Sequence, residues 1–299
     1  MKVLLTGASG LLGGNCLAQL SRNPSVQLFA THRNSDFSIP NTFAHGIKAF
    51  PLDLTNETAV WNIVSTVQPN LIIHTAAHTE TAFCEWNRQD AYALNVKATK
   101  TLASLADMFS ARFIFISTDL VFDGTKGNYS EEDAPNPLSY YAETKLEAEV
   151  LVRKLVGNHI ILRVPLMLGV SPRANRSVNA RLIKEFEAGK TVNLFCDEYR
   201  TPICASVLAR VIEEVAIGRL SEITGLFHAG GAERVSREDL GRKIAARWKF
   251  NQDLIQSTWS SDEPSTPPRP KDVSLNSKEL HSRLPFKIPS LEESLNALP

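Results

Sequence analysis

Hydrophobic residues form short continuous runs that alternate with longer stretches of helical periodicity through the first half of the chain. The apolar runs predict strands at residues 2–6, 26–31, 46–50, 70–75, 112–117 and 159–163, and the periodic stretches predict helices at 11–21, 59–67, 89–109 and 140–155. Strands without polar alternation are typical of a parallel sheet that has helices on both faces. The pattern therefore predicts the α/β class, with a doubly wound parallel sheet of the Rossmann type.

The alternation loosens after Pro165. Helices are expected at 178–188, 205–217 and 237–248, short strands at 191–195 and 225–229, and a proline-rich loop at 262–270. The segment Ser290-Leu-Glu-Glu293 predicts a capping box that begins a last helix. We therefore expect a dinucleotide-binding domain at 1–165 and a smaller C-terminal α/β substrate-binding lobe at 166–299, with part of about 200–225 returning to the main sheet.

Composition narrows the class of protein. The 299 residues are 43% hydrophobic, and the formal net charge is zero, so the chain offers no basic surface that would indicate a nucleic-acid partner. No apolar run approaches the roughly twenty residues that a membrane span needs. The cysteines have no metal-ligand spacing and are expected as buried thiols in a reducing compartment; they are Cys16, Cys84, Cys196 and Cys204. We expect a cytoplasmic protein without a metal site.

A glycine-rich segment, Gly7-Ala-Ser-Gly10-Leu-Leu-Gly13-Gly14, lies between the first predicted strand and the first predicted helix. Free backbone N–H groups at a helix N-terminus bind a pyrophosphate, and missing Cβ atoms allow its close approach. Turn glycines alone are common, but the position between a strand and a helix favours a binding role. The segment predicts a phosphate-binding turn for a dinucleotide of the nicotinamide kind.

The residues that end the second predicted strand indicate which dinucleotide to expect. NAD sites place Asp or Glu there, where the carboxylate accepts hydrogen bonds from the adenosine ribose. Residues 30–34 contain no acid, and the Arg33 guanidinium could bind a 2′-phosphate instead, although a surface arginine would look the same in the sequence. The pattern favours NADP(H) over NAD(H).

A tyrosine and a lysine four positions apart begin the helix predicted at 140–155. Tyr141 and Lys145 share one helix face, so the ammonium is expected to lower the pKa of the phenol toward the range that proton transfer needs. This spacing alone is weak, since it also fits a packed aromatic beside a solvated charge. Thr118 and Ser117 strengthen it, because they end the preceding strand at the edge where ligands bind in doubly wound folds.

Several segments resemble the extended short-chain dehydrogenases/reductases. The GxxGxxG spacing of the glycine turn is typical of that superfamily. The segments ISTDLVFDGTKG (116–127), NPLSYYAETKL (136–146), AAHT (76–79) and DEYRTP (197–202) are similar to dTDP-4-dehydrorhamnose reductases. The resemblance covers most of residues 1–205.

This resemblance implies hydride transfer from the nicotinamide to C4 of a nucleotide-linked 4-keto sugar. Tyr141 would protonate the oxygen, Thr118 would polarise the carbonyl, and Lys145 would also hold the nicotinamide ribose. Asn95 would support the active-site helix, and Asp53 would contact the adenine. The full cofactor-binding set is Gly7, Ser9, Gly10, Leu11, Leu12, Gly13, Arg33, Asp53, Leu54, Ala76, Ala77, Asn95, Tyr141 and Lys145. The family also suggests a homodimer.

The substrate side departs from the family pattern. Family members commonly have an acidic and a basic residue shortly after the AAHT segment, where this chain has Ala82 and Phe83, so the sugar is not specified. Arginine side chains that could bind a substrate diphosphate, or that could equally form surface ion pairs, are Arg163, Arg200 and Arg269. His78 is expected to line the cleft.

Two other functions fit the same residues. A nucleotide-sugar epimerase or dehydratase would retain NAD(H) and recycle it, and Asp119 beside Thr118 keeps that alternative open. A regulatory subunit like that of methionine adenosyltransferase would bind the cofactor without turnover. The presence of Thr118, Tyr141 and Lys145 argues against this last alternative, although fold alone does not fix function.

Overall fold

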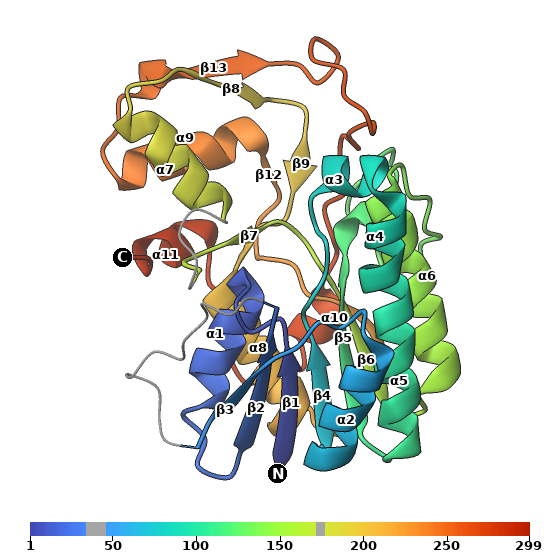
Figure 1. The fold of residues 1–299 in the computed structure, drawn as a ribbon. Helices are drawn as coiled ribbons and strands as arrows, with labels where there is room; N and C mark the ends of the chain where they lie inside the picture. Colours follow the sequence, from blue (N-terminus) through green and yellow to red (C-terminus); the bar gives the residue numbers. More distant parts are fainter. Residues whose placement is uncertain (34–45, 172–176) are drawn as a thin grey trace.

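The computed structural model describes residues 1–33, 46–171 and 177–299. Its centre is a seven-stranded sheet in the order β11-β6-β5-β4-β1-β2-β3, with every neighbouring pair parallel (Figure 1). The strands are β1 (Lys2–Thr6), β2 (Gln27–His32), β3 (Lys48–Pro51), β4 (Leu71–His74), β5 (Arg112–Thr118), β6 (His159–Val164) and β11 (Gly225–His228). The predicted doubly wound parallel sheet is confirmed.

Helices cover both faces of this sheet. One face packs against α1 (Leu11–Leu20) and α8 (Ala205–Ile217), and the other against α2 (Glu57–Val67), α5 (Ala98–Met108) and α6 (Tyr140–Leu155). Alternate residues of a strand point to opposite faces: Val3 and Leu5 belong to the first core and Leu4 to the second. Burial on both faces explains why the strand sequences are continuously apolar.

A smaller lobe lies beyond the carboxyl ends of the sheet strands (Figure 1). Its helices are α7 (Val178–Glu187), α9 (Arg237–Arg247) and α11 (Leu291–Asn296). Its strands form three pairs: β8 (Val192–Phe195) with β13 (Ile255–Thr258), β9 (Tyr199–Arg200) with β12 (Val235–Ser236), and β7 (Met167–Leu168) with β10 (Ile203–Cys204). The predicted capping box is confirmed, since Ser290 and Glu293 cap the start of α11 reciprocally.

Part of the second half of the chain returns to the main sheet. Helix α8 packs on α1, and β11 extends the sheet next to β6, so the returning segment runs to His228, slightly past the range expected. The short helix α10 (Lys278–His281) follows near β11, and its Leu280 joins the same core as α1 and α8. The two halves of the chain therefore share one core.

The helix expected at 89–109 is interrupted. It consists of α4 (Arg88–Tyr92), a π-helical turn η1 (Ala93–Lys97) and α5. The short helix α3 (Thr81–Trp86) precedes them, and the 3₁₀ turns η2 (Asp119–Val121) and η3 (Gln252–Leu254) lie elsewhere. Hydrophobic periodicity does not distinguish a π turn from the α-helix around it, whereas π turns often occur at functional sites.

Within the described ranges, no helix is long and apolar enough to cross a membrane. In the same residues, no group of three or more His, Cys, Asp or Glu is placed to hold a metal ion. The cysteines are free thiols, and Cys196 is the one that is partly exposed rather than buried.

Candidate active site

The glycine turn lies at the carboxyl end of β1. Gly7 has φ +75°, and a Cβ added there would lie 2.8 Å from the backbone nitrogen of Ala76. A Cβ at Gly13 would lie 2.1 Å from the carbonyl oxygen of Gly7, so α1 packs onto the turn only because both residues are glycine. The turn is therefore fixed by steric fit between backbone segments.

The N-terminus of α1 fits an anion. Gly10 caps the helix without a side-chain hydrogen bond, and the first turn has no acidic residue. Among the described residues, no partner accepts a hydrogen bond from the backbone N–H groups of Leu11, Leu12 or Gly13. Free N–H groups at the positive end of a ten-residue helix suit the pyrophosphate of a dinucleotide.

The ends of β2, β3 and β4 place the other predicted cofactor residues along one edge. Arg33 is exposed directly after β2. The pKa of Asp53 is lowered mainly by hydrogen bonds from Thr55 and less by the Arg33 charge. The pKa of His78 is lowered mainly by burial and less by the Arg33 charge. Leu54 is buried beside Asp53. Residues 34–45, which follow Arg33, lie outside the described part of the chain. No acid lies among residues 30–33, as the NADP(H) prediction requires.

Asn95 lies in the π turn and joins three segments of the site. Its Oδ1 accepts a hydrogen bond from the backbone N–H of His78 (2.8 Å), and its Nδ2 donates to the carbonyl of His78 (3.0 Å) and to Thr144 Oγ1 on α6 (3.1 Å). The predicted supporting role of Asn95 fits this geometry. The His78 ring packs against the Phe83 ring in a tilted arrangement, with centroids 4.6 Å apart, so an aromatic pair lies at this edge of the site.

Thr118, Tyr141 and Lys145 lie close together under the smaller lobe. Thr118 ends β5, and α6 begins at Tyr140 with Ser139 as its cap, so Tyr141 lies in the first helical turn. All three side chains are buried, and Tyr141 packs with Cys84 and Ala91. The Thr118 hydroxyl lies near enough to the Tyr141 phenol to lower its pKa. The structure thus brings together the three residues predicted as catalytic.

The pKa shifts of this group correct one expectation. We expected Lys145 to lower the pKa of Tyr141, but burial raises it, and the nearby Thr118 hydroxyl lowers it only in part. Burial lowers the pKa of Lys145 to about 7, against the charge of Glu149, which raises it. The Lys145 ammonium lies 4.0 Å from the centroid of the Phe115 ring. In this state the phenol is protonated at neutral pH.

Asp119 connects the catalytic strand end to the smaller lobe. Its Oδ1 accepts a hydrogen bond from Thr118 Oγ1 (3.2 Å), and its Oδ2 lies 3.6 Å from Arg200 Nε on β9. Burial raises the pKa of Asp119 to about 6, while Arg200 and the hydrogen bond lower it. The predicted substrate residue Arg200 therefore lies beside Asp119, the neighbour of the predicted catalytic residue Thr118.

Arg200 belongs to a cluster of four arginines, which are Arg181, Arg200, Arg237 and Arg269. Burial first, and then the charges of the other three arginines, lower the pKa of Arg237 to about 10, opposed by the charge of Glu198. Among the described residues, the Arg237 side chain has no hydrogen bond and no ion pair. A partly buried cation such as Arg237, without a partner and repelled by its neighbours, is costly unless an anion joins it.

Two of these arginines escaped the sequence analysis. Arg237 follows the cap Ser236 at the start of α9, and Arg181 lies on α7; both look like ordinary surface charges in the sequence. Arg269 was predicted, and its Nε lies 3.9 Å from Glu198 Oε1. Only the fold brings α7, β9, α9 and the segment at Arg269 together.

The structure corrects the prediction for Arg163. The residue is 2% exposed, and both Nε and Nη2 donate to the carboxylate of Glu149 at 3.0 and 2.8 Å. The residue ends near the active-site edge of β6, as expected, but α6 covers it. Arg163 is thus the partner of a buried carboxylate and is not placed to bind a diphosphate.

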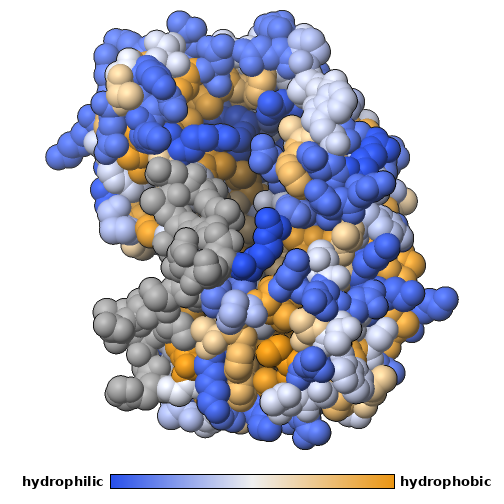
Figure 2. Space-filling view, viewed as in Figure 1, coloured by the Kyte–Doolittle hydropathy of each residue, from blue (hydrophilic) through white to orange (hydrophobic). Residues whose placement is uncertain are grey.

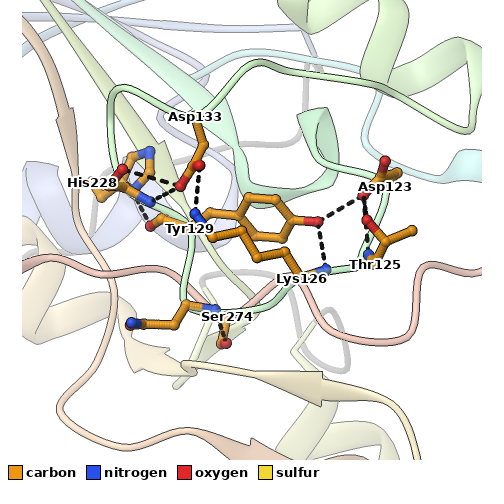
Figure 3. A network of polar contacts seen from close by, with 9 residues as sticks. Asp123, Thr125, Lys126, Tyr129, Asp133, His228 and Ser274 are labelled. Atoms are coloured by element: carbon orange, nitrogen blue, oxygen red, sulfur yellow. Dashed lines mark hydrogen bonds and ion pairs between the residues drawn. The ribbon is translucent and has the colours of Figure 1, made fainter.

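The loop between Thr118 and Tyr141 is held by distant parts of the chain (Figure 3). The Tyr129 hydroxyl donates to Asp123 Oδ1 (2.7 Å), and the Tyr129 backbone N–H donates to the carbonyl of Ser274 (2.8 Å). The carbonyl of Tyr129 lies 3.0 Å from Nδ1 of His228 on β11. The loop between Thr118 and Tyr141 is therefore anchored by β11 and by the segment at Ser274.

Comparisons with known proteins match nearly the whole chain. The family model described as "RmlD substrate binding domain" matches residues 1–298. Two relatives are 30% identical: methionine adenosyltransferase 2 subunit beta of Bos taurus (98% of this chain, 87% of that protein) and the probable low-salt glycan biosynthesis reductase Agl14 of Haloferax volcanii (100% and 97%). The crystal structure of a dTDP-4-dehydrorhamnose reductase from Clostridium acetobutylicum superposes with TM-score 0.84 at 28% identity, covering 99% of this chain and 97% of that one.

Proposed function

This chain belongs to the RmlD substrate-binding-domain family of extended short-chain dehydrogenases/reductases, and on that premise we propose that it is an NADP(H)-dependent reductase of a nucleotide-linked 4-keto sugar. It is an oxidoreductase of the short-chain dehydrogenase/reductase type. The observation that supports the specific proposal best is the buried pair of Thr118 and Tyr141 at the sheet edge that also forms the glycine turn.

Tyr141 is the proton donor in this mechanism. Burial keeps its phenol protonated at neutral pH, and a protonated phenol can give its proton to the oxygen of a carbonyl that is being reduced. When bound, the nicotinamide would supply the hydride to the sugar C4. The Thr118 hydroxyl would polarise the same carbonyl, and the Lys145 cation would stabilise the phenolate that remains.

The four-arginine cluster supports a substrate linked to a nucleotide. A nucleotide-linked sugar has a diphosphate, and guanidinium groups bind phosphate oxygens in pairs. Arg200 lies 3.6 Å from Asp119, whose neighbour Thr118 would face the sugar carbonyl, so a ligand could reach both groups at once. The hollow between the two parts of the molecule is lined by polar and apolar surface (Figure 2).

The preference for NADP(H) rests on Arg33. Residues 30–34 contain no carboxylate to accept hydrogen bonds from an unphosphorylated ribose, and the Arg33 charge acts along the same edge as Asp53 and His78. A 2′-phosphate would give this exposed guanidinium a partner. A cytoplasmic location and a homodimer stay predictions.

The test is turnover with defined substrates. Purified protein is given NADPH or NADH with a panel of dTDP- and UDP-linked 4-keto sugars, and oxidation is followed by absorbance. We expect NADPH oxidation with at least one sugar, and a loss of turnover of about 100- to 10,000-fold in Tyr141→Phe at saturating cofactor. Tyr140→Phe is the matched control, because its hydroxyl precedes the catalytic one by a single residue.

Other outcomes would contradict the proposal. Full turnover in Tyr141→Phe would exclude the proton-donor role. Tightly retained NAD(H) with interconversion of sugars and no net oxidation would favour an epimerase or dehydratase. Dinucleotide binding without turnover of any sugar would favour a role like the one named for the bovine relative.

A further inference from the structure

A buried carboxylate extends the active-site face of α6. Tyr141, Lys145 and Glu149 follow one another at intervals of four residues, and residues at that interval lie on the same helix face. Glu149 is fully buried at 0% exposure. Tyr141 and Lys145 take part in the proposed reaction, whereas Glu149 has no role in it so far. An ionisable group buried this deeply needs partners.

Glu149 has partners on two adjacent strands of the sheet. Ser117 Oγ on β5 donates to Glu149 Oε1, and Arg163 on β6 donates from Nε to Oε1 and from Nη2 to Oε2. Ser117 and Arg163 are register partners in the β5–β6 pair, so the sheet itself aligns them below α6. Arg163 is held in turn over the Phe122 ring, 5.0 Å from its centroid. The carboxylate is therefore fixed at one place, next to Lys145 on the helix.

The charges around Lys145 come from few groups. His74 on β4 is neutral at pH 7, because burial and then the charge of Lys145 lower its pKa to about 3. His228 on β11 is neutral too, because burial and then Arg163 lower its pKa to about 4. Asp119, after β5, acts on the phenol of Tyr141. Glu149 is thus the carboxylate that acts on Lys145 within the described residues, and Arg163 is the cation that shares it.

We propose that Glu149 is a positioning residue that keeps Lys145 charged while the reaction runs, and that Arg163 limits this effect by sharing the carboxylate. The inference rests on the proposed function, in which Lys145 works as a cation beside Tyr141. It also explains why Arg163 is buried at the strand end instead of reaching the cleft. The pair sets the pH range in which the site can work.

The sign of the effect follows from the charges. In Glu149→Gln, Lys145 loses its carboxylate and the neighbouring Arg163 guanidinium loses its counter-charge, so the ammonium gives up its proton at lower pH. In the double variant Glu149→Gln/Arg163→Met both charges are gone, and the pKa of Lys145 falls less than in Glu149→Gln. The double variant also leaves no unpaired guanidinium or carboxylate between α6 and the strand ends, which protects its folding.

The titration of Lys145 is measured directly in the cofactor-free protein, by NMR of the Cε carbons in ¹³C-lysine-labelled samples. The Lys145 signal is assigned as the one missing in Lys145→Arg. Relative to the wild type, we expect its titration to move down by about two pH units in Glu149→Gln and by about one in the double variant. The alkaline limb of kcat/KM should move in the same order.

An unchanged Lys145 titration in both variants would overturn the inference. A double variant whose Lys145 titration moves as far as that of Glu149→Gln would overturn it too, because that result indicates repacking alone. If Glu149→Gln does not fold, the double variant compared with the wild type still decides the question. Because the NMR titration needs no substrate, a protein that turns over no sugar but shows the expected order would refute the proposed function and leave this inference standing.

Discussion

The glycine turn at the sheet edge and the four-arginine cluster of the smaller lobe both fit phosphate groups, but they are built from different parts of the chain. The turn offers backbone N–H groups of consecutive residues, fixed by steric contact between Gly7 and Gly13. The cluster offers long side chains from four separate segments, with Arg237 unpaired among the described residues. A site made of backbone is rigid before the ligand arrives, whereas a site made of like charges is strained until the ligand arrives.

This difference predicts opposite costs of substitution. Changes in the turn should damage the fold and the binding together, because the same atoms serve both. Removal of the unpaired Arg237 from the cluster should weaken binding without lowering stability, because this cation is repelled by its neighbours in the free protein. The following substitutions test this contrast from the largest expected effect to the smallest.

Gly13→Ala tests the backbone-made site. The new Cβ would lie 2.1 Å from the carbonyl oxygen of Gly7, so α1 must move away from the turn. We expect NADPH and NADH to bind more than about 100-fold more weakly, because two or more charge-assisted hydrogen bonds are lost, and the free energy of unfolding to fall by about 1 to 3 kcal/mol. Calorimetric titration and denaturant unfolding measure the two effects.

Gly157→Ala is the control for that substitution. A Cβ there meets nothing within 4 Å, so the same chemical change should leave binding and stability at their wild-type values. Wild-type dinucleotide affinity in Gly13→Ala would mean that the turn does not need the close packing of α1.

Arg237→Met tests the side-chain-made site. Loss of one charge-assisted contact should weaken binding of the nucleotide-linked sugar, or of the nucleoside diphosphate alone, by about 10- to 100-fold and leave NADPH affinity unchanged. The free energy of unfolding should not fall, because a repelled cation has been removed. Arg219→Met, an exposed arginine at the end of α8, is the control. A loss of stability in Arg237→Met with no effect on diphosphate binding would refute the ligand role of the cluster.

The same contrast explains what the sequence could predict. The turn is local, so glycine spacing between a strand and a helix is enough to find it, and continuous apolar strands are enough to predict the doubly wound sheet. Tyr141 and Lys145 were found for the same reason, since helical spacing links them. The π turn at Asn95 was not predicted, because it leaves no mark in the hydrophobic periodicity. It is accompanied instead by hydrogen bonds of Asn95 with His78 and Thr144, which lie far from it in the sequence.

Nonlocal sites could not be found this way. Arg163 was placed in the cleft because it ends a strand, yet whether a strand end is open depends on the helix above it, and Glu149 of α6 pairs with it there. Arg181 and Arg237 become neighbours of Arg200 only after the smaller lobe has folded. A charged residue in a sequence does not reveal whether its partner is a carboxylate of the protein or a ligand.

Arg33→Ser tests the one long side chain that is proposed for the backbone-made site, and it should have the smallest effect. NADPH affinity should fall about tenfold, the worth of one exposed charge-assisted contact, while NADH affinity stays unchanged, because NADH has no 2′-phosphate. Arg22→Ser, which replaces an exposed arginine in the turn after α1, is the control.

A second readout of Arg33→Ser needs no cofactor. The Arg33 charge lowers the pKa of His78, so the imidazole titration of His78 should move to higher pH in Arg33→Ser. A shifted His78 with equal loss of NADH and NADPH binding would place Arg33 at the edge but remove the argument for NADP(H). The turn would then bind the pyrophosphate of either dinucleotide, and the choice between them would have to come from residues that contact the ribose elsewhere.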